Sequence, residues 1–262
     1  MAFFRGDFTS QVMQMVTTIH VVMPEYIDKK DTRVLYLLHG LSDNCSNWFR
    51  LTSLERYANE YKIAVVVPEV QRSMYTNMKY GLRYFDYVSE ELPRFISQMF
   101  GVPNDREHRF VAGLSMGGYG ALKCALTYPE RYAGCAAFSS ACDIQELVHG
   151  PLGEARKDEN RAIYGEKLEI PEEDDLFFLA EQCSKQKEQP CFLMTCGDQD
   201  ILLPQNHKLR DRMQELGFDL RYEEWEGDHT WMFWDTSLQL ALSHLMGEKL
   251  GGNPTPLAER ED

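Results

Sequence analysis

The stretch GLSMGGYG, residues 113–120, constrains this chain most, because it packs four glycines around one serine where a helix should begin. The apolar run 109–112 before it predicts the end of a buried strand, and apolar residues at helical spacing follow it as far as Pro129. Glycine destabilises regular elements by about 0.5–1 kcal/mol relative to alanine, so such a cluster needs a reason. A sharp strand-to-helix turn is one, because neighbours without a Cβ let the two backbone arms approach and leave the Ser115 hydroxyl exposed.

Gly113 to Gly117 therefore match the G-x-S-x-G nucleophile elbow of α/β-hydrolases. A glycine-rich turn with an incidental serine is the alternative interpretation, and the strand before and helix after the motif favour the elbow. The segment is not a phosphate-binding loop, because it lacks the lysine of G-x-x-x-x-G-K-[ST] and the spacing of G-x-G-x-x-G.

Strand and helix patterns alternate along the chain, which predicts an α/β protein with a mainly parallel central sheet and helices on both faces. The expected strands are 11–23, 34–38, 63–67, 133–139, 191–196 and 219–225, and the expected helices include 53–61, 88–100 and 205–216. We expect one domain over residues 1–250, followed by a frayed tail at 251–262. The charged segment 143–188 predicts a helical insertion over the sheet edge, either part of a lid or a solvated connection.

Composition narrows the classes of function. The chain has 262 residues with Lys+Arg 27 against Asp+Glu 41, a formal charge of -14 that disfavours nucleic acids and anionic membrane surfaces as partners. An N-terminus without an export signal and the lack of a long apolar span predict a cytoplasmic protein. Seven cysteines without C-x-x-C spacing indicate reduced thiols rather than disulfides or a metal site. A homo-oligomer is left open.

A nucleophilic serine needs a base, and α/β-hydrolases present the triad in the chain order serine, acid, histidine. Four histidines follow Ser115, namely His149, His207, His229 and His244. The first lies ahead of any suitable acid loop, and the second and fourth lie within expected helices. His229 occupies the polar loop EGDHTW between the last strand and the last helix, so it is the candidate base.

The acid should follow the strand 191–196, where the chain reads Gly-Asp-Gln-Asp over residues 197–200. Asp200 is preferred, because hydrolases of this kind often show G-x-x-D here and the residues after it would hold the loop against the core. Asp198 is then expected to form the turn, but it stays an alternative acid. The acid accepts the imidazole Nδ1 proton and fixes the tautomer of the base.

Two backbone amides should form the oxyanion hole, one after the nucleophile and one in the loop after the third strand. The first is Met116. The second is Leu41, since Gly40 lets the chain turn where the buried strand ends in His39. His39 is expected to support this loop rather than to act as an acid or base.

Several longer motifs now resemble one family. LYLLHGLSDNCSNWFR, YTNMKYG, SEELP, FVAGLSMGGYGALKCAL, CGDQD and GDHTWMFW occur in the order seen in the esterase D group of the α/β-hydrolase superfamily. The chain is most similar to bacterial tributyrin esterases of that group, and S-formylglutathione hydrolases and acetyl xylan or feruloyl esterases are relatives. The resemblance covers about residues 5–247 and is weakest over 143–188. It implies the α/β-hydrolase fold, no cofactor, carboxylic ester hydrolysis, and Ser115, Asp200 and His229 in the matching positions.

Three functions compete. The first is a serine carboxylesterase that hydrolyses short-chain acyl esters, on small molecules or carbohydrates, through an acyl-enzyme. The second is a hydrolase of S-formylglutathione or of acetylated or feruloylated xylan, or an acyltransferase, with the same triad chemistry. The third is a non-catalytic binding module, which the full set of triad and oxyanion elements disfavours.

Bulky aromatic residues near the motifs predict a narrow acyl slot that prefers acetyl to butyryl groups, because apolar pockets discriminate by about 1–3 kcal/mol per methylene that does not fit. Trp48 and Tyr75 are the candidate pocket residues, with burial in the core as an equal alternative. Trp231 is expected in the core, since it begins the apolar stripe of the last helix.

Overall fold

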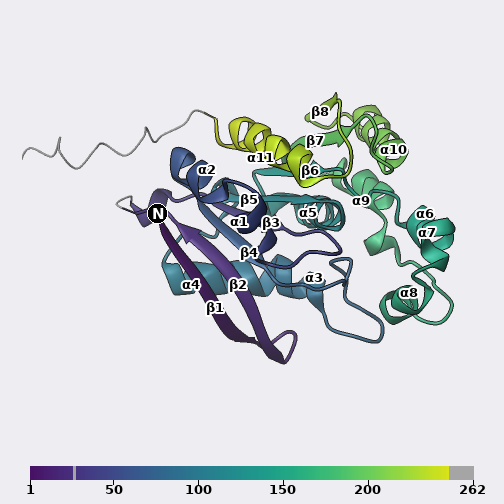
Figure 1. Ribbon diagram of the computed structural model, residues 1–262, viewed down its shortest axis with the longest axis horizontal. Coiled ribbons are helices and arrows are strands. Elements are labelled where there is room, and N and C mark those ends of the chain that lie inside the picture. The colour runs from purple at the N-terminus through teal and green to yellow at the C-terminus, as the bar shows by residue number, and fades with distance from the viewer. Residues whose placement is uncertain (26–27, 248–262) are drawn as a thin grey trace, which may run out of the picture.

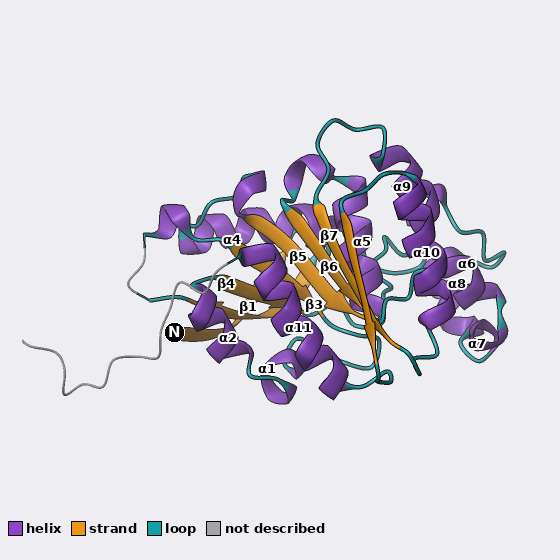
Figure 2. Cartoon of the chain, turned by 90° about the horizontal axis from the view of Figure 1, so that it is seen from above, coloured by secondary structure: helices purple, strands orange, loops and turns teal. Residues whose placement is uncertain are grey.

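The central feature of the computed structural model, which describes residues 1–25 and 28–247, is one eight-stranded sheet with helices on both faces (Figures 1 and 2). The strands lie in the order β1-β2-β4-β3-β5-β6-β7-β8. Their bounds are β1 Ala2–Ser10, β2 Met15–Met23, β3 Val34–Leu38, β4 Ala64–Pro68, β5 Arg109–Leu114, β6 Gly134–Phe138, β7 Cys191–Gly197 and β8 Leu220–Trp225. All neighbours from β4 to β8 pair in parallel, which confirms the predicted mainly parallel sheet.

The first two strands differ from the expectation of a single early strand. β1 and β2 form an antiparallel hairpin, and β2 pairs antiparallel with β4. β1 was not predicted, because its sequence AFFRGDFTS mixes exposed apolar and charged residues without a clear period. Its nine-residue pairing with β2 stabilises it instead.

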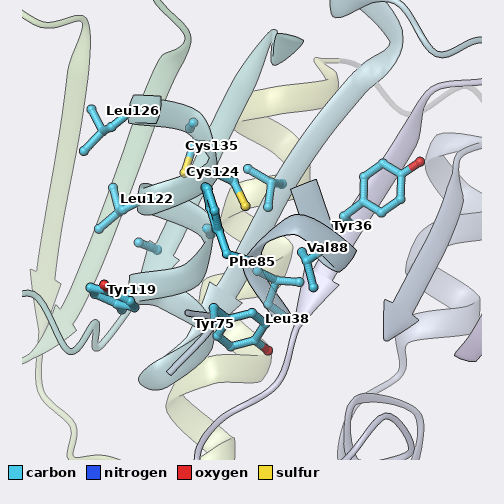
Figure 3. Packing of buried hydrophobic residues seen from close by; sticks show 14 of the residues in the cluster. Tyr36, Leu38, Tyr75, Phe85, Val88, Tyr119, Leu122, Cys124, Leu126 and Cys135 are labelled. Atoms are coloured by element: carbon cyan, nitrogen blue, oxygen red, sulfur yellow. The ribbon is translucent and has the colours of Figure 1, made fainter. Parts of the chain in front are cut away.

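Two layers of helices enclose the sheet. One face carries α1 Asn47–Leu51, α2 Leu54–Tyr61 and α11 Trp231–Met246. The other carries α3 Tyr84–Asp86, which continues through a π-turn into α4 Leu92–Phe100, together with α5 Met116–Thr127, α9 Leu176–Cys183 and α10 Leu203–Glu215. Figure 3 shows Leu122 and Leu126 of α5 in this second layer, where each fully buried side chain contributes about 1.5–3 kcal/mol.

The segment 143–188 folds into helices and is anchored in the core. It contains α6 Ile144–His149, α7 Pro151–Glu154, α8 Lys157–Tyr164 and α9. Asp174 forms a buried ion pair with Lys123 of α5, and its backbone carbonyl accepts a hydrogen bond from the Tyr119 hydroxyl at 2.7 Å. The last helix of the segment, α9, also buries Leu176 and Leu179 in the same layer as α5.

Two further expectations concern the chain as a whole. No helix within residues 1–25 and 28–247 combines the length and hydropathy needed to cross a bilayer. The expected tail at 251–262 lies outside the described residues.

Candidate active site

Ser115 lies on the turn between β5 and α5, with φ +53° and ψ −116°, a conformation that costs a residue other than glycine about 1–3 kcal/mol. Two close backbone approaches hold this turn. A Cβ on Gly113 would lie 2.3 Å from the Gly117 carbonyl oxygen, and a Cβ on Gly117 would lie 2.3 Å from the Leu38 carbonyl oxygen. Any side chain at either position would displace backbone, so the elbow requires glycine at both.

The structure brings Ser115, His229 and Asp200 together from three segments far apart in the chain. The Ser115 hydroxyl donates to His229 Nε2 at 3.0 Å. His229 lies in the loop between β8 and α11, and its Nδ1–H donates to the Asp200 carboxylate at 2.9 Å to the nearer oxygen. Asp200 follows β7. This chain of two hydrogen bonds fixes the imidazole so that Nε2 can take the serine proton.

Asp200 is buried, and several donors keep it ionised. Burial raises the pKa of its carboxyl group, but the hydrogen bond and charge of His229 and the Leu202 amide, at 2.8 Å, outweigh burial and hold the pKa below its usual value. The Ser139 hydroxyl is a further donor that lowers this pKa.

Asp198 has a different place in the same loop. Its side chain is exposed and accepts a hydrogen bond from the Gly227 amide at 3.1 Å. The two loops also touch through their backbones, because a Cβ on Gly197 would lie 2.3 Å from the Gly227 carbonyl oxygen. Asp198 therefore ties the turn after β7 to the loop that carries His229, whereas Asp200 contacts the imidazole itself.

Ser139 and Trp234 belong to the site, although sequence reasoning missed both. Trp234 donates its indole N–H to the Ser139 hydroxyl at 3.1 Å, and its ring packs edge-on against His229 with centroids 4.9 Å apart. Ser139 has φ +45° and is buried at the end of β6. Its position after a strand that neighbours β5 was the one signal in the sequence, but its conformation is set by packing.

Of the two expected oxyanion donors, Leu41 lines the cavity next to Ser115, and Met116 follows Ser115 directly at the start of α5. Among the hydrogen bonds of the described residues, none uses the amide of Leu41 or of Met116. The Met116 amide is the first of α5, where the unpaired N–H groups of a helix favour negative charge.

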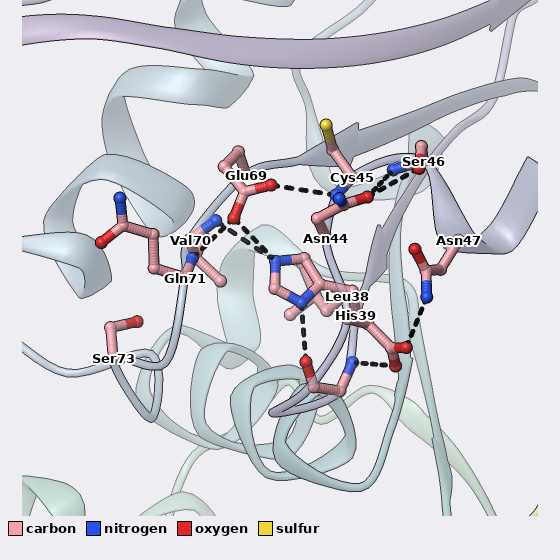
Figure 4. Close-up of polar contacts among 12 residues, drawn as sticks. Leu38, His39, Asn44, Cys45, Ser46, Asn47, Glu69, Val70, Gln71 and Ser73 are labelled. Carbon is pink, nitrogen blue, oxygen red and sulfur yellow. Dashed lines mark hydrogen bonds and ion pairs between the residues drawn. The ribbon is translucent and has the colours of Figure 1, made fainter. Parts of the chain in front are cut away.

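His39 orients the peptide group that carries the Leu41 amide (Figure 4). The ring is completely buried, and its Nδ1–H donates to the Gly40 carbonyl at 2.8 Å. In a planar trans peptide the C=O and the next N–H point in opposite directions, so a Gly40 carbonyl held toward His39 turns the Leu41 N–H away from it. Val70 donates its amide to Nε2 at 3.3 Å, which requires the Nδ1–H tautomer.

A second set of contacts fixes the loop around His39. Glu69 lies 3.6 Å from His39 Nε2 and accepts hydrogen bonds from the amides of Cys45 and Gln71. Asp43 accepts the Gly40 amide at 3.2 Å. His39 thus supports the loop, as the sequence suggested, within the network that Figure 4 shows.

A cavity of about 530 Å³ opens over Ser115. Its lining residues are Gly40, Leu41, Ser42, Asp43, Leu114, Ser115, His229, Thr230, Trp231 and Trp234. No residue of the segment 143–188 is among them, so the expectation of a lid has no support from this cavity. The insertion borders a separate cavity of about 600 Å³ beside residues 77–80.

The aromatic residues near the motifs divide between the core and the cavity wall. Trp48 and Tyr75 are fully buried and do not line the cavity, so their prediction as pocket walls is wrong. Trp48 donates to the Leu38 carbonyl at 3.1 Å, and the Tyr75 hydroxyl donates to the His39 carbonyl at 3.0 Å. Both therefore hold the chain that leads into the oxyanion loop. Trp231, expected in the core, is half-buried and lines the cavity.

The described residues contain no group of three or more histidine, cysteine, aspartate or glutamate side chains placed to hold a metal ion. The groups that the site brings together are a serine hydroxyl, an imidazole, a carboxylate and backbone amides.

Comparisons with known proteins agree with this geometry. The family model described as "Putative esterase" matches residues 10–245. An acetyl esterase from Caldicellulosiruptor saccharolyticus is 31% identical over 251 residues, which are 90% of this chain and 94% of that protein.

Two solved structures from Staphylococcus aureus are similar over most of the chain. The fluorophosphonate-binding serine hydrolase F (FphF) has a TM-score of 0.86 and 32% identity, covering 94% of this chain and 99% of that chain. The S-formylglutathione hydrolase FrmB has a TM-score of 0.82 and 31% identity over the same shares. These likenesses confirm the α/β-hydrolase fold and the resemblance to the esterase D group.

The contacts of the two aspartates predict different losses of activity. Asp200→Asn removes the carboxylate that accepts the imidazole proton, so we expect kcat to fall by about 10³–10⁴. Asp198→Asn keeps an oxygen that can accept the Gly227 amide, and we expect a loss of about tenfold or less. Steady-state kinetics on 4-nitrophenyl acetate measure both. The reverse ranking would show that Asp198 is the acid.

The contact between His39 and Gly40 predicts a loss confined to kcat. His39→Leu frees the Gly40–Leu41 peptide to rotate, and losing one oxyanion donor costs up to about 10²–10³ in kcat, so we expect a fall of at least about tenfold with little change in KM. His39→Asn, whose amide can reach the Gly40 carbonyl from the place of Nδ1, should retain most of the activity.

His20, another buried histidine, is the control for this experiment because it lies on β2, away from the Ser115 cavity. We expect His20→Leu to change stability but not kcat. Equal kcat for His39→Leu and the unmodified protein, at equal folded fraction by circular dichroism, would show that His39 does not orient the donor.

Proposed function

Because the chain belongs to this esterase family and is a carboxylic ester hydrolase, we propose that it is a serine esterase for short-chain acyl esters, with Ser115, His229 and Asp200 as its triad. The observation that carries the proposal is the pair of hydrogen bonds from Ser115 to His229 at 3.0 Å and from His229 to Asp200 at 2.9 Å, on a strained turn.

Acylation follows from this geometry. The Ser115 oxygen attacks the ester carbonyl while His229 Nε2 takes its proton, and Asp200 stabilises the imidazolium that forms. The oxyanion then lies against the amides of Leu41 and Met116, each worth about 3–4 kcal/mol in comparable sites. Collapse breaks the bond to the alcohol oxygen, which receives the proton from His229, and the acyl group stays on Ser115.

Deacylation repeats these steps with water as the nucleophile. His229 takes a proton from the water, the hydroxide adds to the acyl carbonyl, and the same two amides stabilise the second oxyanion. The Ser115 oxygen leaves with the proton from His229, which restores the resting site and releases the carboxylic acid. The His229 ring is partly exposed, so water can reach it.

A rigid aromatic wall supports the preference for short acyl groups. Trp231 follows His229 by two residues and lines the cavity. Its ring packs edge-on against Trp48 and Trp234, with centroids 5.1 Å and 5.4 Å apart. A side chain held on two sides in this way cannot swing aside for a long acyl chain without losing both contacts.

The charge of the cavity favours an uncharged ester over the second candidate, S-formylglutathione, which the relatives FrmB and other S-formylglutathione hydrolases bring into consideration. Asp43 and His229 are the titratable residues among those that line it, and no lysine or arginine is present there. The carboxylates of a glutathione leaving group would therefore face Asp43 without a cation to pair with. Acetyl esters of small alcohols or of carbohydrates avoid this cost.

Ser115→Ala tests the proposed nucleophile directly. We expect kcat to fall by about 10⁴–10⁶, as for other triad serines, while the circular dichroism spectrum is unchanged. The unmodified protein should react with a fluorophosphonate probe at one residue, and Ser115→Ala should not react. A variant that keeps more than about one hundredth of the activity would exclude Ser115 as the nucleophile.

A substrate series tests the acyl and leaving groups. We expect kcat/KM to be highest for 4-nitrophenyl acetate to butyrate and to fall by at least about tenfold at octanoate, since misfit methylenes cost about 1–3 kcal/mol. Trp231→Ala should flatten this fall, and Trp231→Phe should keep it. S-formylglutathione should be a poorer substrate than the acetate ester. A profile that rises toward octanoate would indicate a long acyl groove instead, and a preference for S-formylglutathione would favour the second candidate.

A further inference from the structure

β1 forms an open edge of the sheet. Its nine residues pair with β2 on one side, and no described strand pairs with them on the other. Figure 1 shows this strand at the border of the molecule, far from α10 at the opposite edge. The sequence AFFRGDFTS contains neither proline nor lysine, which commonly protect edge strands from pairing with another chain. The outer backbone groups of β1 are therefore able to accept a further strand.

Exposed apolar side chains gather along this edge. Of the ten large apolar side chains exposed in the described part of the chain, six lie on β1, on β2 or on the two helices beside them. They are Phe3, Phe4, Met15, Val16, Leu51 of α1 and Met99 of α4. The rings of Phe3 and Phe49 lie 5.0 Å apart, and those of Phe4 and Phe100 5.5 Å apart, so the apolar surface extends onto both faces of the sheet. Such clustering marks an interaction surface.

The charges on β1 identify the partner that fits. Arg5 and Asp7 are both exposed and stand on either side of Gly6. Among the described residues neither side chain forms an ion pair, and Asp7 accepts a hydrogen bond from Thr18 only. When two copies of the segment Arg5-Gly6-Asp7 lie antiparallel with their glycines opposite each other, the cation of each strand lies opposite the anion of the other.

We propose that two copies of this chain associate by antiparallel pairing of their β1 strands about a twofold axis at Gly6. This register places Arg5 of each copy opposite Asp7 of the other, on the same side of the joined sheet. It also places Phe4 of one copy opposite Phe8 of the other. A shift by one residue would lose the charge pairing and move the side chains to opposite faces, so the charges select one register.

The axis position suits its residue. A Cβ on Gly6 would meet no atom within 4 Å in the single chain, so the face of the sheet is open at the axis and a side chain can be introduced there. The pairing joins the two sheets edge to edge. Ser115 follows β5, which is separated from β1 by β2, β4 and β3, so the cavity over Ser115 stays open in the dimer.

Oligomeric state and charge reversal test this proposal. By size-exclusion chromatography with light scattering, on protein with a C-terminal tag, we expect twice the chain mass of 30.4 kDa. Arg5→Asp places like charges opposite each other twice in each dimer and should raise the dissociation constant by at least about tenfold. The charge-exchanged variant Arg5→Asp with Asp7→Arg should restore dimerisation, because it reverses both pairs.

A cross-link tests the register itself. Gly6→Cys should form a disulfide between the two copies on mild oxidation, because opposite Cα atoms in antiparallel strands lie about 4.5–5.5 Å apart. Thr9→Cys, three residues from the axis, should not cross-link. The unmodified chain is the control, since its own cysteines are buried or half-buried.

The outcomes separate this proposal from the proposed function. We expect the same esterase kcat/KM per chain for the dimer and for Arg5→Asp. A monomer at about 100 μM, a dimer that Arg5→Asp does not weaken, or a dimer that Gly6→Cys does not cross-link would each overturn pairing through β1 in this register.

Discussion

The close crossing of backbones beneath Ser115 is the constraint on which the rest of the site depends. A Cβ on Gly113 or Gly117 would lie 2.3 Å from a backbone oxygen, so only glycine lets β5, α5 and the end of β3 meet at this distance. The crossing holds Ser115 at φ +53°. It also brings the first amide of α5 next to the loop that carries Leu41. One packing contact therefore positions both the nucleophile and the two amides expected to stabilise the oxyanion.

The acid and the base depend on a second approach between loops. The turn after β7 touches the loop after β8 where the backbones of Gly197 and Gly227 meet. In the same place the Asp198 carboxylate accepts a hydrogen bond from the Gly227 amide. This contact joins the two loops that carry Asp200 and His229. Because Asp200 is buried and paired, it stays anionic and fixes the imidazole without competing for the serine proton. The structural and the chemical tasks thus fall to different aspartates of one turn.

The aromatic residues near the site have two different roles: Trp231 lines the cavity, whereas Trp48 and Tyr75 are buried and hold the backbone beside it. Trp48 and Tyr75 bind the carbonyls of Leu38 and His39 from within the core, and Trp231 faces the cavity with Trp48 behind it. Sequence reasoning left Trp48 and Tyr75 open between pocket wall and core, and it placed Trp231 in the core. An aromatic residue near a motif can lie in the core or in a cavity wall. An apolar stripe indicates that one face of a helix is buried, but it does not give the exposed fraction of each side chain on that face.

The sequence alone determined the parallel strands, the elbow, and the order of Ser115, Asp200 and His229, because continuous apolar runs and glycine at a strand-to-helix junction are local signals. The tertiary structure decided the rest. β1 exists only through its pairing with β2, Ser139 and Trp234 reach the triad from other elements, and the tautomer of His39 depends on Val70. Each of these depends on distances between segments far apart in the chain, and such distances are set when the whole sheet and its helices pack together.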